Sequence, residues 1–340
     1  MGFWKKAAVG IGAVTALAVM LGVGVVVYAF ATMGSRISAP DTPYPNVAAS
    51  TDPETIARGR YLVYGPAHCA SCHLTFEGHT PPKGDITELT IAGGYEFAMG
   101  PMGTRYAANI TSDPVTGIGS RTDQEIARAI RTGVLHDGEI SLFMRYSAAN
   151  LSDEDLVAVV SYLRTVEPVV RPKPAPTLGI FPLLSLMFEM TPDLTPAPAH
   201  VPMGLEPSVE RGAYLADEVM LCTSCHRPFD MATFQPIGPK GGGGTPEPSH
   251  GADSVMEFVP PNLTSDPTGM TGRLDEDAFV ARIKHGRVYE SSIMPWENFR
   301  LTDEIDLRSV YRYLRSLPPV QNDVGPTYRK IGSWPPAEAG

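Results

Sequence analysis

Two short motifs contain all of the cysteines in the chain. "CASCH" runs from Cys69 to His73, "CTSCH" runs from Cys222 to His226, and the sequence has four cysteines in total. Three kinds of site use cysteines at this spacing: a zinc site, a redox-active dithiol and a covalent attachment site for haem. A zinc site could use this spacing, a redox dithiol could use part of it, and haem attachment uses both cysteines together with the histidine that follows them.

The rest of the sequence favours haem attachment. A redox dithiol belongs beside a βαβ pattern, which the sequence lacks, and a zinc site would need ligands from motifs that lie in separate copies of a repeat. We therefore predict two covalently attached haem c groups, each bound by the cysteines of one motif and ligated by its histidine. The predicted residues are Cys69, Cys72 and His73 for the first haem, and Cys222, Cys225 and His226 for the second.

The two motifs lie within a long internal repeat. "RGRYL" at Arg58 recurs as "RGAYL" at Arg211, and "NITSDP" recurs as "NLTSDP"; like the cysteine motifs, each second occurrence follows the first by 153 positions. The spacing then falls to 150, where "LSDE" at Leu151 pairs with "LTDE" at Leu301. A duplication of this length predicts two small domains in tandem.

A methionine stands at the same place in each copy. Met144 in "SLFMRY" and Met294 in "SSIMPW" both lie seven residues before the LSDE or LTDE segment. A lone methionine in an apolar loop is usually core filler. Matched positions in two copies instead predict that both thioethers are sixth iron ligands, which raise the reduction potential. Met99 and Met102 are nearby competitors in the first copy.

Other polar residues within the copies are weaker candidates. Five further histidines have no equivalent in the other copy, and we interpret them as surface or supporting residues. Three residues are candidates for hydrogen bonds to haem propionates, although a solvated or packing role fits them equally well. The histidines are His68, His79, His136, His250 and His285, and the propionate candidates are Arg105, Arg145 and Trp296.

Both copies are predicted to be all-α. Asp52 followed by proline is a typical helix start, and Thr122 opens a capping box whose helix ends at Gly133. Ser152 and Thr302 are the predicted caps of the last helix in each copy. Few stretches show the alternation of a strand. The first of the two last helices has an apolar stripe consisting of Leu156, Val159, Val160 and Leu163.

The N-terminal region predicts a membrane anchor. Residues 7–31 form an uncharged stretch that is long enough for a tilted transmembrane helix. Lys5 and Lys6 precede this stretch. The positive-inside rule then places residues 1–6 in the cytoplasm and the remainder on the periplasmic side of a bacterial inner membrane. The rival interpretation is a cleaved signal peptide with its cleavage site at "AFA".

The remaining boundaries follow from the repeat and from composition. The apolar centre of the proline-rich segment, Leu178 to Met190, is too short to span a membrane and is predicted to pack onto a domain. A net charge of −10 without clustered Lys and Arg argues against nucleic acid as a partner. The predicted division is a linker at 32–50, domain 1 at 51–168, a proline-rich inter-domain segment at 169–205, domain 2 at 206–320 and a C-terminal tail at 321–340.

These motifs resemble the class I cytochrome c fold and, more narrowly, the cytochrome c subunit of periplasmic membrane-bound alcohol and gluconate dehydrogenases. The resemblance covers residues 51–320 and includes "IMPW" and the "YLR" that closes each copy. It implies that Gly59 and Gly212 let the first helix of each copy cross the last one closely, against Tyr162 and Tyr313. It also implies that the two matched methionines are axial ligands. The chain departs from that family in having two haem motifs rather than three, and an N-terminal anchor.

The expected function is electron transfer. We expect a membrane-anchored periplasmic dihaem cytochrome c that relays single electrons between a dehydrogenase or quinol-oxidising complex and a terminal oxidase or soluble carrier of a respiratory chain. Such a protein is not an enzyme by itself, although it fits as a subunit of an oxidoreductase complex. The alternative is a dihaem peroxidase-like enzyme with one open haem site, which two matched methionines disfavour.

Overall fold

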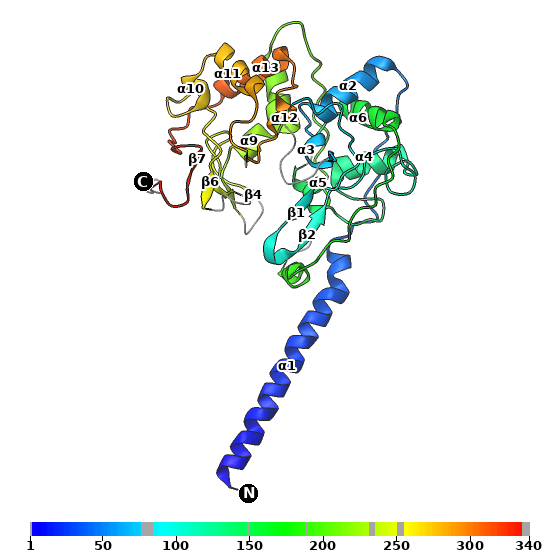
Figure 1. Cartoon of the computed structure of the whole chain (residues 1–340), viewed down its shortest axis with the longest axis vertical. Coiled ribbons are helices and arrows are strands. Elements are labelled where there is room, and N and C mark those ends of the chain that lie inside the picture. The colour runs from blue at the N-terminus through cyan, green and yellow to red at the C-terminus, as the bar shows by residue number, and fades with distance from the viewer. Residues whose placement is uncertain are drawn as a thin grey trace.

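A long N-terminal helix stands apart from a helical body. The computed structural model describes residues 2–75, 84–147, 150–187, 190–230, 235–249, 255–290 and 292–334. Helix α1 (Phe3–Arg36) projects from the body, and the N terminus lies at its far end (Figure 1). Its Ile11–Arg36 portion is long and apolar enough to cross a membrane, a test that a signal sequence near an N terminus also passes. The helix is longer than the expected anchor at 7–31.

The first copy of the repeat is built mainly from short helices. Its first helix, α2, lies against its last helix, α6, and a two-stranded hairpin is inserted between them. The hairpin strands pair antiparallel, with Phe97 opposite Arg105. The elements are α2 (Pro53–Tyr64), α3 (Ala70–His73), β1 (Glu96–Ala98), η1 (Gly100–Met102), β2 (Thr104–Tyr106), α4 (Asp123–Thr132), α5 (Leu142–Ser147) and α6 (Asp153–Thr165).

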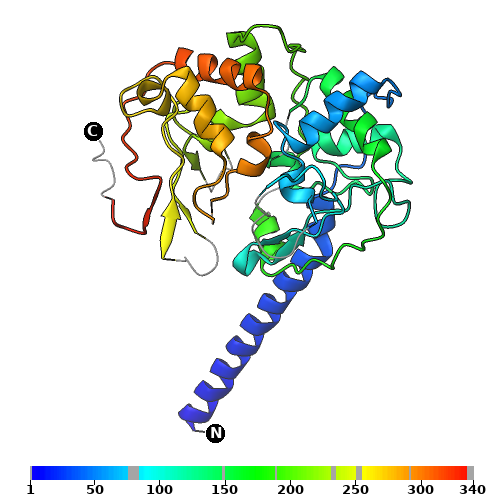
Figure 2. The same cartoon turned by 45° about the horizontal axis from the view of Figure 1, so that its top comes forward.

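The second copy repeats this plan. Its first helix continues into a π-helical turn, η3, and both lie against the last helix, α13. The helical elements are α8 (Val209–Ala213), η3 (Tyr214–Val219), α9 (Cys222–Cys225), α10 (Met270–Arg273), α11 (Glu276–His285), α12 (Trp296–Phe299) and α13 (Glu304–Ser316). Figures 1 and 2 both show the helices of the two copies side by side.

Short strands complete the second copy. Strands β3 (Phe229–Asp230) and β4 (Gln235–Pro236) pair antiparallel. A three-stranded sheet joins β5 (Glu247–Pro248), β6 (Met256–Phe258) and β7 (Tyr328–Lys330). Strand β7 belongs to the segment expected to be a C-terminal tail, and it pairs with β6. The strands are only two or three residues long, so the structure is helical with little strand, as the sequence predicts.

Glycine allows the first and last helices of each copy to touch. A β-carbon at Gly59 would overlap the carbonyl oxygen of Ala158 and lie 2.7 Å from Cβ of Tyr162. A β-carbon at Gly212 would overlap the carbonyl oxygen of Ser309 and lie 2.8 Å from Cβ of Tyr313. The close crossings implied by the resemblance are therefore present in both copies.

Most of the predicted helix ends are confirmed. Asp52 caps α2 by accepting a hydrogen bond from the Thr55 amide, and Thr122 forms both halves of a capping box with Glu125. The stripe predicted on α6 is buried, and Ser152 caps that helix. The prediction for Thr302 is wrong because α6 begins at the third residue of its LSDE segment, whereas α13 begins at the fourth residue of its LTDE segment. Asp303 occupies the N-cap position instead.

The inter-domain segment packs where α1 meets the body. Helices α7 (Phe181–Leu184) and η2 (Ser185–Met187) contact the end of α1. Phe181 and Met190 join a small apolar cluster with Ile37, Val134 and Ile140. The cluster also includes residues of the first copy, so the segment packs onto folded protein, as predicted.

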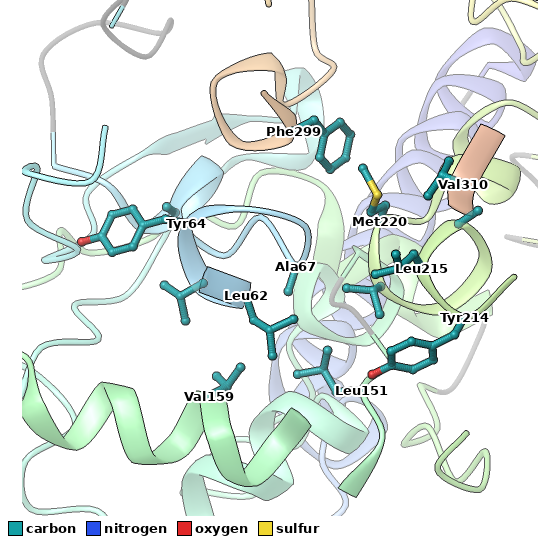
Figure 3. Close-up of a cluster of buried hydrophobic side chains, with 14 of the residues drawn as sticks. Leu62, Tyr64, Ala67, Leu151, Val159, Tyr214, Leu215, Met220, Phe299 and Val310 are labelled. Atoms are coloured by element: carbon teal, nitrogen blue, oxygen red, sulfur yellow. The ribbon is translucent and has the colours of Figure 1, made fainter. Parts of the chain in front are cut away.

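One continuous apolar core serves both copies. The buried cluster includes Leu62 and Val159 from the first copy together with Leu215 and Val310 from the second. Figure 3 shows side chains of both copies pointing toward each other across this region, with Leu151 beside Tyr214. The two copies are therefore joined by packed apolar surface as well as by the connecting segment.

Candidate functional site

The two cysteine motifs are presented by the same local backbone. In each copy, an amide just before the motif donates a hydrogen bond to the carbonyl oxygen five residues earlier. The Ala67 amide lies 3.0 Å from the Leu62 oxygen, and the Met220 amide lies 2.7 Å from the Leu215 oxygen. The next residue, His68 or Leu221, has a positive φ of 43° or 57°. This turn directs the chain into the short helices α3 and α9, so the matching spacing in sequence becomes a matching structure.

The histidines of the two motifs are oriented alike. Nδ1 of His73 lies 2.8 Å from the carbonyl oxygen of Ala108, and Nδ1 of His226 lies 2.8 Å from that of Pro261. A carbonyl oxygen only accepts hydrogen bonds, so each Nδ1 carries the proton and each Nε2 has a free lone pair. Metal-ligating histidines are typically fixed in this way.

Burial keeps both rings neutral. It lowers the pKa of His73 and of His226, and the hydrogen bonds to the carbonyl oxygens only partly oppose this effect. Within the described residues, no protein group hydrogen-bonds Nε2 of either histidine. A neutral imidazole whose Nε2 lone pair is not occupied by a hydrogen bond is the form that binds iron.

None of the four motif cysteines is paired in a disulfide. Burial, with a smaller contribution from the neighbouring cysteine, raises the pKa of Cys69 and of Cys222 to about 12. Reactive dithiols show the opposite shift. Among the described residues, no cluster of three or more His, Cys, Asp or Glu side chains gathers around a common point, so the donors of a zinc site are not brought together. The thioether chemistry of haem attachment fits both motifs better.

The two matched methionines lie in different secondary structure, one in a helix and one in a loop. Met144 lies within the short helix α5, and its amide is 3.3 Å from Oγ of Ser141. Met294 lies in the loop before α12 and packs against the large apolar core. The competitors Met99 and Met102 are the N-cap and the last residue of η1, at the tip of the β1–β2 hairpin.

A buried ion pair holds the Met294 loop. Arg287 is bidentate to Glu297, with Nε–Oε1 at 2.8 Å and Nη2–Oε2 at 2.6 Å, and both side chains are at most 5% exposed. The same guanidinium donates to the carbonyl oxygens of Ser292 and Met294, the latter at 3.4 Å. In the first copy Val134 follows the matching glycine, so the equivalent position has no charge.

Sequence reasoning missed this pair. Arg287 and Glu297 have no counterparts at the matched positions of the first copy, and the comparison of the copies attends only to what they share. A comparison of where the copies differ could have found it. Arg287 directly follows Gly286, whereas a valine follows the aligned Gly133.

The weaker candidates have protein partners. Nη1 of Arg105 donates to the carbonyl oxygen of Thr177, and Arg145 forms an ion pair with Asp193 at 3.3 Å. The Trp296 ring stacks with the guanidinium of Arg282 at 4.0 Å.

The five further histidines within the copies fall in three groups. His136 and His285 are exposed, as predicted. His68 is not a surface residue, since its ring packs edge-on against Phe299 of the other copy, with centroids 5.5 Å apart. His79 and His250 lie outside the described residues.

Known proteins with similar sequences include cytochrome c subunits of dehydrogenases. No protein-family model matches the chain. The chain is 32% identical over 294 residues to "Alcohol dehydrogenase (quinone), cytochrome c subunit" of Gluconacetobacter polyoxogenes, covering 81% of this chain and 58% of that protein. It is 30% identical to "Gluconate 2-dehydrogenase cytochrome c subunit" of Pantoea cypripedii, covering 77% and 59%. It is 28% identical to "Diheme cytochrome c-type" of Cereibacter sphaeroides, covering 52% and 61%.

The expected resemblance is confirmed. The chain spans less than two thirds of the length of these relatives. A cytochrome c subunit is an electron-transfer component, which agrees with the expectation of an electron carrier rather than an enzyme. The chain is thus homologous to the cytochrome c subunits of alcohol and gluconate dehydrogenases.

Proposed function

We propose that this chain is a dihaem cytochrome c with two tandem class I domains that relays single electrons as part of a dehydrogenase complex. The donor would be a dehydrogenase or quinol-oxidising complex, and the acceptor a terminal oxidase or soluble cytochrome. Helix α1 would anchor it to a bacterial inner membrane with both domains on the periplasmic side. A relative named as a diheme cytochrome c supports two haems.

The duplicated histidine geometry carries this proposal. Both motif histidines follow a cysteine pair, are neutral, and donate Nδ1–H to a carbonyl oxygen at 2.8 Å. Haem iron bound there would take up and release one electron at a time. The chain's own residues would hold it in place. The cysteines would attach the porphyrin covalently, and the histidines together with Met144 and Met294 would ligate the iron.

An optical redox titration, repeated under carbon monoxide, tests the proposal. With two methionine ligands, both haems are expected to be low-spin, to titrate at positive potentials and to ignore carbon monoxide. Met294→Leu should open only the second haem to carbon monoxide, and Met144→Leu only the first. Met99→Leu and Met102→Leu are matched controls that should leave both haems closed.

The titration also separates the alternative. A wild-type haem that binds carbon monoxide readily and titrates at low potential would contradict the double methionine ligation. The peroxidase-like enzyme would then account for the chain better, because that chemistry needs an open iron site.

The Arg287 pair gives a second prediction. Arg287→Leu should free the Met294 loop and leave the Glu297 carboxylate buried without its cation, which typically costs about 3–5 kcal/mol. We expect the sulfur-to-iron charge-transfer absorption of the ferric protein to fall to the amount contributed by Met144 alone. Arg308→Leu is the matched control, because Arg308 lies on the surface among Glu276, Asp277 and Glu304. An unchanged absorption in Arg287→Leu would show that the pair does not position Met294.

A further inference from the structure

Two arginine–aspartate pairs, one partly exposed and one buried, lie on either side of the boundary between the copies. Arg58 is bidentate to Asp155, with Nε–Oδ1 and Nη2–Oδ2 both at 2.9 Å. Arg211 is bidentate to Asp306, at 2.9 Å and 3.1 Å. Each arginine is in the first helix of its copy and each aspartate in the last helix, so each pair fastens one helix crossing.

A tyrosine from the opposite copy completes each pair. The Tyr61 hydroxyl of the first copy donates to Oδ2 of Asp306 at 2.7 Å. The Tyr214 hydroxyl of the second copy donates to Oδ2 of Asp155 at 2.7 Å. The two tyrosines occupy the same place in the matching "RGRYL" and "RGAYL" segments. Each follows the arginine of its own copy by three residues and bonds the aspartate of the other copy.

The two tyrosine hydroxyls also make matching contacts with the backbone of the other copy. The Tyr61 hydroxyl accepts a hydrogen bond from the amide of Asp303 at 3.2 Å, and the Tyr214 hydroxyl accepts one from the amide of Ser152 at 3.1 Å. Asp303 and Ser152 are the N-cap residues of α13 and α6. Each tyrosine therefore docks at the start of the last helix of the other copy, which is the self-complementary pattern of a two-fold interface.

The charges favour these bonds. Burial, then the Asp306 charge, raises the pKa of Tyr61; burial, then the Asp155 charge, raises that of Tyr214. Both hydroxyls therefore remain donors. Burial alone would raise the pKa of Asp155, but the hydrogen bond and charge of Arg58 outweigh it and lower that pKa. A charged acceptor makes each tyrosine bond stronger than a neutral one.

The cysteine motifs lie beside the same boundary. His68, which precedes Cys69, packs on Phe299 of the second copy. Nδ2 of Asn298 donates to the carbonyl oxygen of Tyr64 at 2.8 Å. Cys69 and Cys222 both pack against the shared apolar core, in the region where Figure 3 shows Ala67, Met220 and Phe299.

We propose that Tyr61 and Tyr214 lock the two copies in one mutual arrangement and thereby position the two haem-attachment segments for electron exchange within the chain. The inference rests on the proposed dihaem function. Tyr61, Tyr214 and the two ion pairs that they complete act as positioning residues and touch no iron ligand. The apolar core joins the copies, and the reciprocal bonds select one register for it.

Isosteric variants of the full-length haem-loaded protein in detergent test the proposal. Tyr61→Phe, Tyr214→Phe and the double variant each remove only hydroxyl groups. Tyr311→Phe is the matched control, because the Tyr311 hydroxyl bonds the carbonyl oxygen of Leu274 within its own copy at 3.0 Å. Haem content, measured by mass spectrometry, shows first that the proteins are loaded.

Two measurements then report on the lock. Hydrogen–deuterium exchange follows the amides of Ser152 and Asp303, and that of Asn150, which donates to the carbonyl oxygen of Glu218 in the other copy at 2.7 Å. Exchange should rise about tenfold for each bond lost. Exchange spectroscopy on haem methyl NMR signals of half-reduced protein gives the intramolecular electron-exchange rate. We expect that rate to fall in the double variant and to stay at the wild-type value in Tyr311→Phe.

The outcomes separate the two proposals. A wild-type chain with fewer than two covalent haems would overturn the proposed function. Two haems, with an electron-exchange rate in the double variant equal to that of wild type, would overturn the lock and leave the proposed function intact. Equal changes in Tyr311→Phe would also overturn the lock, because they would show a general effect of losing a tyrosine hydroxyl.

Discussion

Replacing Gly212 with alanine is expected to prevent the second copy from folding, and Gly59→Ala should do the same to the first copy. The new β-carbon would overlap the Ser309 or Ala158 carbonyl oxygen, and neither helix can move without giving up its packing. Overpacking a core typically costs about 1–3 kcal/mol, and a clash with backbone on both sides should exceed that range. Mass spectrometry of the purified variants should find one covalent haem per chain instead of two.

The control is a glycine whose β-carbon has room. A β-carbon at Gly204 would meet nothing closer than 3.4 Å, so Gly204→Ala should retain two haems and the thermal unfolding midpoint of wild type. If Gly212→Ala also kept both haems and that midpoint, the close crossing of α8 and α13 would not be needed for the second copy to fold.

Features within one copy could be predicted from the sequence because they depend on local patterns. The capping box at Thr122, the cap at Ser152 and the buried stripe of α6 each follow from residues a few positions apart. The two glycine crossings were also accessible, since the resemblance pairs each glycine with a tyrosine far along the chain. Thr302 was misassigned because the copies differ there by one residue.

Contacts between the copies could not be predicted in the same way. The matching of "RGRYL" with "RGAYL" identifies Tyr61 and Tyr214 as equivalent, but equivalence does not say which aspartate each hydroxyl reaches. That depends on how the two copies pack, and a tyrosine on the face of a helix is compatible with a core, a surface or an interface. The interface position of His68 was missed for the same reason.

The candidate ligands show how far a repeat can be trusted. The histidines are alike in hydrogen bonding, so the equivalence that the repeat predicts for them is present in the structure. The methionines share only their position, since Met144 is in a helix and Met294 in a loop held by Arg287. The copies therefore share the segments that we propose attach the haems, and they differ around the proposed sixth ligands, where potentials would be tuned.

The second large effect is expected at the residue next to Gly212 in the same helix, in Arg211→Leu. The side chains of Arg211 and Asp306 are 2% and 0% exposed. The variant therefore leaves the Asp306 carboxylate buried without its cation, although the Tyr61 hydroxyl still bonds it. Losing one partner of such a pair typically costs about 3–5 kcal/mol. Urea unfolding of the detergent-solubilised protein should show this loss. Arg58→Leu should cost less, because Arg58 is 22% exposed and water can reach the carboxylate that it leaves.

A compensated variant separates charge from packing. In Arg211→Leu, Asp306→Leu, Tyr61→Phe the buried charge and both of its polar partners are removed together. Replacing a buried ion pair with apolar residues is often neutral or stabilising, so the triple variant should recover most of the unfolding free energy. Because it also removes one arm of the reciprocal lock, it should regain stability without regaining protection of the Asp303 amide. A triple variant as unstable as Arg211→Leu would mean that the arginine side chain acts through its packing and not through its charge.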